Sequence, residues 1–360
     1  MTLDQNEIET QIKAILSESL NAPSGDNVQP WSFSISGNKV TLYNNPERDL
    51  SLYNFDQIAS YISEGALVEN IAIVATKYGY KTNLELFTNS TNSENMVGYI
   101  SFFKEDLEQD KLYPYISSRI TNRKPYKDIP LEKEIIDEIN IINQSSIKII
   151  SEKNDISLLA EAASRNEFLV LNNYGLHKFL FDHIKWTQES ADRDREGFFV
   201  KTFEMNALQR FIFKLASSWG RMKILQKLGL ASKVASENKK TYQQSASFIS
   251  FVVSDVNKFS SFQVGRDLQR LWLTLTSFGV SLHPLTGIVF LKNKIDNSDS
   301  LDLSNTEKDI INQAYSEISR IFKIESHEKI IFLARVGFAD PPSAASPKKP
   351  LDQFIVSNVS

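Results

Sequence analysis

The alternation of apolar and polar residues predicts a complete α+β unit in the first third of the chain. Apolar residues recur at helical spacing up to residue 20 and then at every second position in short runs, which is typical of strands. A strongly apolar helix then ends at Gly79. The predicted elements are a helix over 4–20, a hairpin of WSFSI (31–35) and KVTLY (39–43), a helix over 56–79, and strands at 82–87 and 97–103.

The pattern starts again after residue 113 and continues through the rest of the chain. Two apolar runs, SASFISFVV (245–253) and KIIFLARVGF (329–338), indicate buried strands, and a third strand is predicted at 147–151. An acidic stretch, ESADRDRE, separates two of the predicted helices, and a Pro-rich tail follows the last strand. The helices are predicted at 131–141, 155–186, 200–230 and 260–279.

The two most buried helices share a sequence pattern. At a constant offset of 200 residues, SEGALVENIAIVATKYGY (63–80) aligns with QVGRDLQRLWLTLTSFGV (263–280). The aligned pairs include Gly65 and Gly265, Ile71 and Leu271, Ile73 and Leu273, Thr76 and Thr276, and Gly79 and Gly279. The repeat favours a duplicated chain with one central helix from each half. Chance is the alternative, because apolar helices use few residue types.

Composition removes several classes of protein. With 360 residues the chain is long enough for one large domain or two average ones, and its net charge of −4 argues against general nucleic-acid binding. The absence of cysteine excludes disulfides, thiolate metal sites and a Cys nucleophile. The four histidines have no metal-ligand spacing, so we expect no metal. No apolar run reaches the ~18 residues of a membrane span, and the acidic N-terminus is unlike a signal peptide. The cytoplasm is therefore the expected location.

The segment PSGDNVQPW (23–31) concentrates hydrogen-bonding side chains between two prolines. Ser24, Asp26, Asn27 and Gln29 offer donors and acceptors, and Gly25 allows the backbone to approach a planar ligand. Because a proline stiffens each end, binding would cost little entropy. The same residues are typical of a capped turn between a helix and a strand, so the residues alone leave a ligand loop and a plain turn equally open.

A basic segment, SRITNRKPY (118–126), is the second candidate site. Arg119, Thr121 and Arg123 alternate, so an extended chain would present all three on one side. Two guanidiniums beside a hydroxyl suit a phosphate, which accepts charge-assisted hydrogen bonds. A solvated basic loop is the alternative.

Two further candidates lie in the last third of the chain. In HPLTGIVF (283–290) a turn next to His283 would expose backbone amides suited to the edge of a heterocycle, although a plain turn has the same pattern. In the tail, Lys348 and Lys349 stand between prolines. A polar tail without order is the alternative there, but the apolar residues that follow, Phe354 among them, could anchor it.

Together these four segments resemble the FMN-dependent nitroreductase family, and their order resembles its single-chain, dormancy-associated Acg-type branch. In that family a QPW segment borders the flavin ring, an RxSxR segment binds the phosphate and ribityl chain, and a PxxG turn approaches flavin N5. A closing basic element helps to hold the phosphate. The resemblance implies one FMN per chain, bound by Pro23, Ser24, Gly25, Asn27, Gln29, Arg119, Thr121, Arg123, Pro284, Leu285, Thr286, Gly287, Lys348 and Lys349. Thr121 replaces the usual Ser.

The chain departs from the common nitroreductase in the order of its motifs. A usual subunit carries RxSxR first and the QPW segment about 30 residues later, and two subunits share each flavin. Here the order is reversed, and nothing like a QPW segment follows the arginines. The resemblance therefore implies an α+β fold of antiparallel sheets around long central helices, folded as an internal pseudo-dimer. The N-terminal half (1–112) would supply the ring-side loop, and the C-terminal half (113–360) the phosphate site.

Residues 186–244 form an insertion relative to that family pattern. LQRFIFKLASSWGRMKILQKLGL (208–230) is expected to be one helix with an apolar face and basic polar positions. Such a helix could lie on a membrane, but burial against the body is more common. Because Acg-type relatives cover the flavin with an inserted lid, the resemblance favours a lid or a dimer contact.

The resemblance implies an oxidoreductase that passes hydride from NAD(P)H through the flavin to a nitroaromatic, quinone or similar small acceptor. No catalytic side chain is assigned, and neither Asp26 nor His283 is assigned as a proton donor. Two alternatives stay open: a low-turnover protein that stores FMN under its lid, and an oxidase acting on a peptide or other natural product. Small molecules are the expected partners, and a homodimer is left open.

Overall fold

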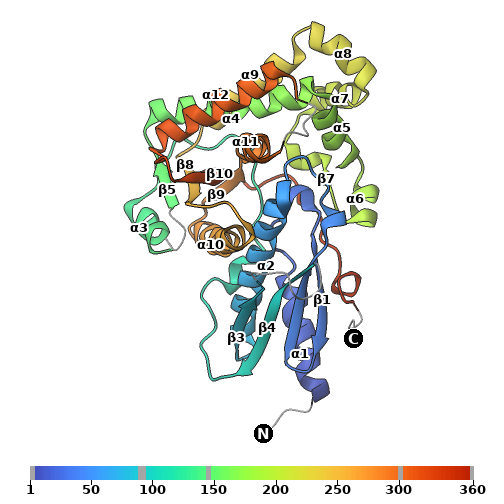
Figure 1. Ribbon diagram of the computed structural model, residues 1–360, viewed down its shortest axis with the longest axis vertical. Helices are drawn as coiled ribbons and strands as arrows, with labels where there is room; N and C mark the ends of the chain where they lie inside the picture. Colours follow the sequence, from blue (N-terminus) through green and yellow to red (C-terminus); the bar gives the residue numbers. More distant parts are fainter. Residues whose placement is uncertain (1–4, 88–94, 143–146, 299–302, 357–360) are drawn as a thin grey trace.

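The computed structural model describes residues 5–87, 95–142, 147–298 and 303–356. Figure 1 shows two layers of sheet and helix stacked along the long axis, with helices α2 and α10 side by side between them. Both four-stranded sheets are antiparallel throughout. The expected α+β class is confirmed.

The N-terminal layer contains the elements that the sequence pattern predicts. The predicted helix over 4–20 begins at Gln5 within the described residues. The elements are α1 (Gln5–Ser19), β1 (Trp31–Ser36), β2 (Lys39–Asn44), α2 (Ile58–Lys77), β3 (Tyr80–Leu86) and β4 (Met96–Lys104), with the strands in the order β1-β2-β4-β3. Gly37 closes the β1–β2 hairpin at a φ of 59°, and Gly79 ends α2 at a φ of 66°. Both glycines hold left-handed conformations that a side chain would strain.

The C-terminal layer is built around a second sheet in the order β5-β8-β10-β9. Its elements are α3 (Lys133–Ile141), β5 (Ile147–Ile150), α4 (Lys153–Asn172), β8 (Ser247–Val253), α10 (Lys258–Ser277), β9 (Ser281–Pro284), α11 (Gly287–Asn297), α12 (Asn305–Ile321) and β10 (Lys329–Gly337). The central strands β8 and β10 are almost entirely buried, which explains their continuous apolar runs.

Polar contacts join α2 to α10 in a reciprocal pattern. The Glu69 carboxylate receives Arg270 Nε at 2.6 Å, and the Gln269 amide donates to Asn70 Oδ1 at 2.6 Å. Residues 69 and 270 of the first contact correspond, at the offset of 200, to residues 269 and 70 of the second. Each contact is therefore the counterpart of the other in the repeat. Gly279 ends α10 at a φ of 70°, as Gly79 ends α2. The sequence repeat therefore coincides with a structural repeat.

The C-terminal tail crosses from the second layer to the first. Phe33 N donates to Phe354 O, and Val356 N donates to Phe33 O, both at 2.8 Å, so the tail extends the N-terminal sheet beside β1. The Phe354 ring is fully buried, 6.1 Å from the Trp31 ring. The predicted apolar anchor is confirmed, and the alternative of a tail without order is wrong up to Val356.

Two predicted helices are broken. The helix expected over 155–186 is α4 followed by α5 (Tyr174–Asp182), because Asn173 caps α5 by accepting from Leu176 N at 3.0 Å. The helix expected over 208–230 is α7 (Ala207–Ala216) and α8 (Trp219–Lys227), and α9 (Leu230–Gln243) follows. Ser218 has extended backbone between α7 and α8, which suits serine better than a helix interior does.

The acidic stretch also differs from the expected connection. It forms a short helix, α6 (Gln188–Asp194), which Thr187 begins with a capping box. A short parallel pair, β6 (Ile184–Lys185) and β7 (Phe198–Phe199), closes around it.

One described helix, Phe55–Lys77, is long and apolar enough to cross a membrane. However, 83% of its apolar window is buried inside the protein, where it packs against α10. It is therefore the core helix between the two layers and does not indicate a membrane span.

Candidate functional site

A cavity of about 730 Å³ lies where the two layers and the insertion meet. Three of the four predicted segments reach it, through Gly25, Arg123 and the turn 284–287. Most of its remaining wall is apolar and comes from α4, α5, α7 and α9 and the loop before α7, and the loop 49–53 contributes further residues. A pocket of this size, mostly apolar with a few convergent polar groups, is typical of a small-molecule site.

The loop after α1 is strained where it borders the cavity. Asp26, Asn27 and Gln29 have positive φ values of 47°, 57° and 53°. Ser24 Oγ accepts from Gln29 N at 3.1 Å and closes the turn, while Pro23 precedes it and does not line the cavity. Clustered left-handed residues other than glycine are uncommon and persist where surrounding contacts hold them, often at functional sites.

The amides of this loop hold other parts of the chain in place. Asn27 Nδ2 donates to Pro347 O at 3.0 Å, and Gln29 Nε2 donates to Arg195 O at 2.8 Å. Gln29 Oε1 accepts from Lys349 N at 2.9 Å. These two amide side chains therefore fasten the C-terminal tail and the insertion to the loop, and neither lines the cavity.

Arg119, which is buried, and Lys348, which is partly buried, form a group of two cations. Arg119 lies 4.4 Å over the Trp272 ring and donates from Nη2 to Asn21 O at 2.9 Å, and Lys348 Nζ donates to Ala22 O at 2.7 Å. Arg119 Nε is buried and has no hydrogen-bond partner among the described residues. No carboxylate in the described ranges pairs with either cation. Burial lowers the pKa of Arg119 to about 10, and burial together with Arg119 lowers the pKa of Lys348 to about 7.

The other residues of the two basic segments have different surroundings. Arg123 lines the cavity, 5.5 Å from the Phe198 and Phe203 rings, and donates to Thr202 O at 3.4 Å. Thr121 forms an isolated parallel β-bridge with Leu282 of β9. Lys349 forms an ion pair with Glu196 of the insertion. Among the residues of these two segments, the charges of Arg119 and Lys348 have no acidic partner in the described ranges. Lys349 differs from its neighbour Lys348, because Glu196 pairs with it.

Four carboxyl groups line the cavity: those of Asp26, Asp49, Glu167 and Glu237. Burial raises the pKa of Asp26, Asp49 and Glu167 to about 7 each, and the Asp26 charge adds to the shift at Asp49. Arg123 opposes the shift at Asp26. Glu167 accepts from the Tyr242 hydroxyl at 3.1 Å. The three groups with a raised pKa can hold or release a proton near neutral pH.

His283 has a defined tautomer. Arg335 Nε donates to His283 Nδ1 at 3.1 Å, so a neutral ring carries its proton on Nε2. Burial and the nearby arginines hold the pKa of His283 well below its usual range, which keeps the ring neutral. Arg335 is fully buried in β10 and also donates to Thr241 O and Lys124 O, at 3.1 and 2.8 Å. His283 therefore lines the cavity as a neutral donor.

The turn 284–287 requires its glycine. A Cβ on Gly287 would lie 2.2 Å from Asn166 Oδ1, and Asn166 receives the Tyr53 hydroxyl at 3.1 Å. Leu285 N donates to Leu333 O at 2.8 Å, which ties the turn to the sheet. The turn leads directly into α11, which begins at Gly287. All four turn residues line the cavity: Pro284, Leu285, Thr286 and Gly287.

Sequence reasoning missed four polar residues of this site: Asp49, Glu167, Tyr242 and Arg335. An arginine inside the apolar run KIIFLARVGF was a usable signal, because a buried arginine needs several acceptors. The other three carry no local signal. Within the described ranges, no cluster of His, Asp or Glu could hold a metal ion.

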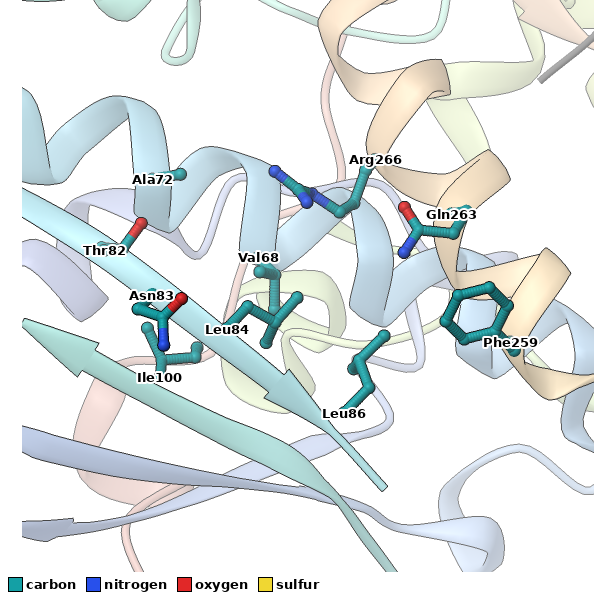
Figure 2. A pocket seen from close by; sticks show the side chains of 10 residues that line it. All are labelled: Val68, Ala72, Thr82, Asn83, Leu84, Leu86, Ile100, Phe259, Gln263 and Arg266. Carbon is teal, nitrogen blue, oxygen red and sulfur yellow. The ribbon is translucent and has the colours of Figure 1, made fainter. Parts of the chain in front are cut away.

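A second hollow of about 480 Å³ lies between α2, β3, β4 and α10 (Figure 2). Its apolar wall includes Val68, Leu84 and Phe259, and Arg266 at its edge is paired with Glu69. None of the predicted site residues lines it. We assign the candidate site to the larger cavity.

The chain has a distant relative of known sequence. It is 22% identical over 351 residues to the uncharacterized protein MT1398 of Mycobacterium tuberculosis, covering 92% of this chain and 46% of the relative. The chain thus spans about half the length of the curated relative it matches. No protein-family profile matches the chain.

Solved structures with partial overlap are flavin enzymes. The nitroreductase NfnB of Sphigopyxis sp. strain HMH overlaps 69% of this chain and 99% of its own, with a TM-score of 0.39 and 10% identity. The NADPH:FMN oxidoreductase of Vibrio harveyi overlaps 70% and 78%, with a TM-score of 0.37 and 11% identity. A nitroreductase with bound FMN from Bacteroides fragilis overlaps 67% and 94%, with a TM-score of 0.36 and 7% identity. Overlaps of this extent do not assign the chain to their family.

Proposed function

We propose that the chain binds one FMN and acts as an NAD(P)H-dependent, nitroreductase-like oxidoreductase of the Acg-type branch. One observation carries the proposal: the buried Arg119 and the partly buried Lys348 lie together without an acidic partner among the described residues, and Arg119 Nε lacks an acceptor there. A buried cation beside a second cation is costly unless an anion pairs with them. A phosphate supplies the missing acceptors and the opposite charge.

The second support is the arrangement of the predicted segments around the cavity. Gly25 and the turn 284–287 line it, as the resemblance implies for residues beside a flavin ring, and Arg123 lines it from the segment that the resemblance assigns to the phosphate and ribityl chain. The phosphate would then bind at Arg119 and Lys348. These two cations hold the backbone of residues 21 and 22, directly before the ring-side loop.

When bound, FMN would supply hydride transfer between NAD(P)H and a small acceptor such as a nitroaromatic or a quinone. The chain's own residues would orient the ring and exclude water. Arg123 and the neutral His283 offer donors, and α7 and α9 close one wall. The carboxyls of Asp26, Asp49 and Glu167 could hold a proton there near neutral pH.

We also propose that the two layers are the halves of an internal pseudo-dimer, divided near residue 112. The reciprocal contacts of α2 with α10 support this division, and so does the tail, which returns to the first sheet as a partner subunit would. The insertion 186–244 would serve as a lid. A cytoplasmic location stays a prediction.

FMN storage is the second candidate function. It is favoured by the wall of insertion residues, which would cover the ring and keep nicotinamide out. The two functions differ in access to the flavin.

A visible absorption spectrum tests the proposal first. Purified chain reconstituted with FMN should be yellow and retain the flavin through gel filtration, and a chain that does not retain FMN would overturn the proposal. Anaerobic addition of NADPH or NADH then separates the functions. Bleaching within seconds supports the reductase, whereas a stable yellow colour supports storage.

A further inference from the structure

Helices α7 and α8 expose large apolar side chains. Leu208 and Phe211 are 67% and 61% exposed, and they share one face of α7 at a spacing of three residues. Ile224 and Leu228 are 63% and 77% exposed, and they share one face of α8 at a spacing of four. The other faces of both helices pack against the body through Ala216 and Met222, as is more common for such a helix, whereas these two faces stay exposed.

The same segment carries only positive charge. From Met205 to Ser236 the sequence contains no Asp or Glu, whereas the whole chain has a net charge of −4. The flanking acids are already engaged: Glu204 accepts from Ser343, and Glu237 pairs with Lys240. The cations of this stretch are Arg210, Lys214, Arg221, Lys223, Lys227 and Lys233, and all but Arg210 are exposed.

The position of the two helices suits contact with an extended surface. In Figure 1, α8 forms the extreme end of the molecule, opposite the N-terminal sheet, with α7 beside it. α7 also lines the cavity through Ile212 and Phe213, and Leu208 belongs both to the cavity wall and to the exposed residues. The cavity and the exposed apolar residues therefore share one helix.

We propose that this α7–α8 surface, formed by Leu208, Phe211, Ile224 and Leu228 with the surrounding cations, docks onto an anionic lipid membrane. Apolar side chains that enter the interface, combined with basic residues that attract anionic headgroups, are the two forces that hold a helix at a bilayer surface. Contact with a second copy through the same surface would bring cations against cations, which the charge pattern disfavours.

Flotation of the full chain with vesicles tests this docking. Binding to vesicles of phosphatidylcholine mixed with phosphatidylglycerol should exceed binding to pure phosphatidylcholine by at least about tenfold and should weaken as salt is raised. The double variant Lys223→Glu/Lys227→Glu should lose this preference. Phe211→Ser/Leu228→Ser should reduce binding to both kinds of vesicle.

Matched controls lie elsewhere on the surface. Lys13→Glu/Lys133→Glu reverses two exposed charges on α1 and α3, and Phe103→Ser removes a half-exposed aromatic residue from β4. Both should bind like the unaltered chain. All variants change exposed residues, so unchanged circular dichroism and unfolding curves would separate lost binding from lost folding.

Two results would overturn the proposal. One is the absence of binding to phosphatidylglycerol vesicles by the unaltered chain. The other is sedimentation showing a dimer that Phe211→Ser/Leu228→Ser converts to a monomer, which would assign the surface to self-association. Neither result depends on FMN, so the docking and the proposed oxidoreductase can fail separately.

Discussion

Gly65 on α2 and Gly265 on α10 each face a backbone carbonyl of the other helix. A Cβ at Gly65 would lie 2.0 Å from Phe262 O, and a Cβ at Gly265 would lie 2.0 Å from Ile62 O. Because 62 and 262 differ by the same 200 residues as 65 and 265, the two contacts are counterparts. The central helices therefore cross backbone to backbone, and only glycine permits that distance.

Gly65→Ala and Gly265→Ala should each destabilise the protein by about 1–3 kcal/mol or more, because the backbones must separate to admit a methyl group. Denaturant unfolding measures the change. Gly220→Ala is the matched control, since its nearest neighbour is Ser218 Oγ at 4.0 Å and it lies inside α8. That variant should be neutral or stabilising. Equal effects from all three would contradict the close crossing.

Local chemistry explains which parts of the fold were predictable. The β1–β2 hairpin and the ends of α2 and α10 depend on residues close in sequence, such as Gly37, Gly79 and Gly279. The broken helices were missed because a cap such as Asn173 competes with helical periodicity, and the contacts around it decide the outcome.

The sequence predicted which segments form the site, but not which residues of each segment line the cavity. The order of the motifs and the family resemblance predict that Gly25, Arg123 and the turn 284–287 share one site, and all three line the cavity. No local pattern separates Lys348, which lies with Arg119, from Lys349, which pairs with Glu196. Asp49 and Glu167 reach the cavity from elements far apart in the chain, so only the three-dimensional fold reveals them.

Lys348→Ala should weaken FMN binding by about 1.5–3 kcal/mol, the range for a hydrogen bond to a charged group. Lys349→Ala is the adjacent control and should change affinity less, because Glu196 already pairs with Lys349. Fluorescence titration of free FMN measures both constants. Equal losses would contradict the placement of the phosphate at Lys348.

FMN affinity should fall as pH rises above about 7. Burial and Arg119 lower the pKa of Lys348 to about 7 in the chain without ligand. A bound phosphate favours the charged ammonium and raises that pKa, so binding takes up a proton above pH 7. Calorimetric titrations in buffers of different ionisation enthalpy would count the proton. The uptake should disappear in Lys348→Ala, and its persistence there would assign it to another group.

Asp26→Asn should stabilise the protein above pH 7 and have little effect near pH 3. Burial raises the pKa of Asp26 to about 7 from 3.8, so between these values the folded chain holds a proton that the unfolded chain has lost. The unaltered protein therefore loses stability as pH rises from about 4 to about 7. Asparagine tolerates the left-handed backbone at residue 26, which makes it the suitable substitution. A difference in unfolding free energy that stays constant with pH would rule out this titration.

Glu64 on α2 is the residue whose replacement should stabilise the core most directly. Its side chain is fully buried, and neither carboxylate oxygen has a hydrogen-bond partner among the described residues. Burial raises its pKa well above 4.5, against the opposing charge of Lys258. The folded chain thus keeps this carboxyl protonated while the unfolded chain ionises, and stability falls as pH rises above about 4.5.

Glu64→Met removes both the buried polar group and the titration, so its gain in unfolding free energy should grow from pH 5 to pH 8. Glu64→Gln removes the titration but keeps unpartnered polar atoms, so it should show a smaller gain at every pH. Thermal and denaturant unfolding across this pH range measure both variants. If Glu64→Met destabilises the protein at pH 8, the carboxylate must have a stabilising partner, and the crossing of α2 and α10 would depend on charge as well as on the two glycines.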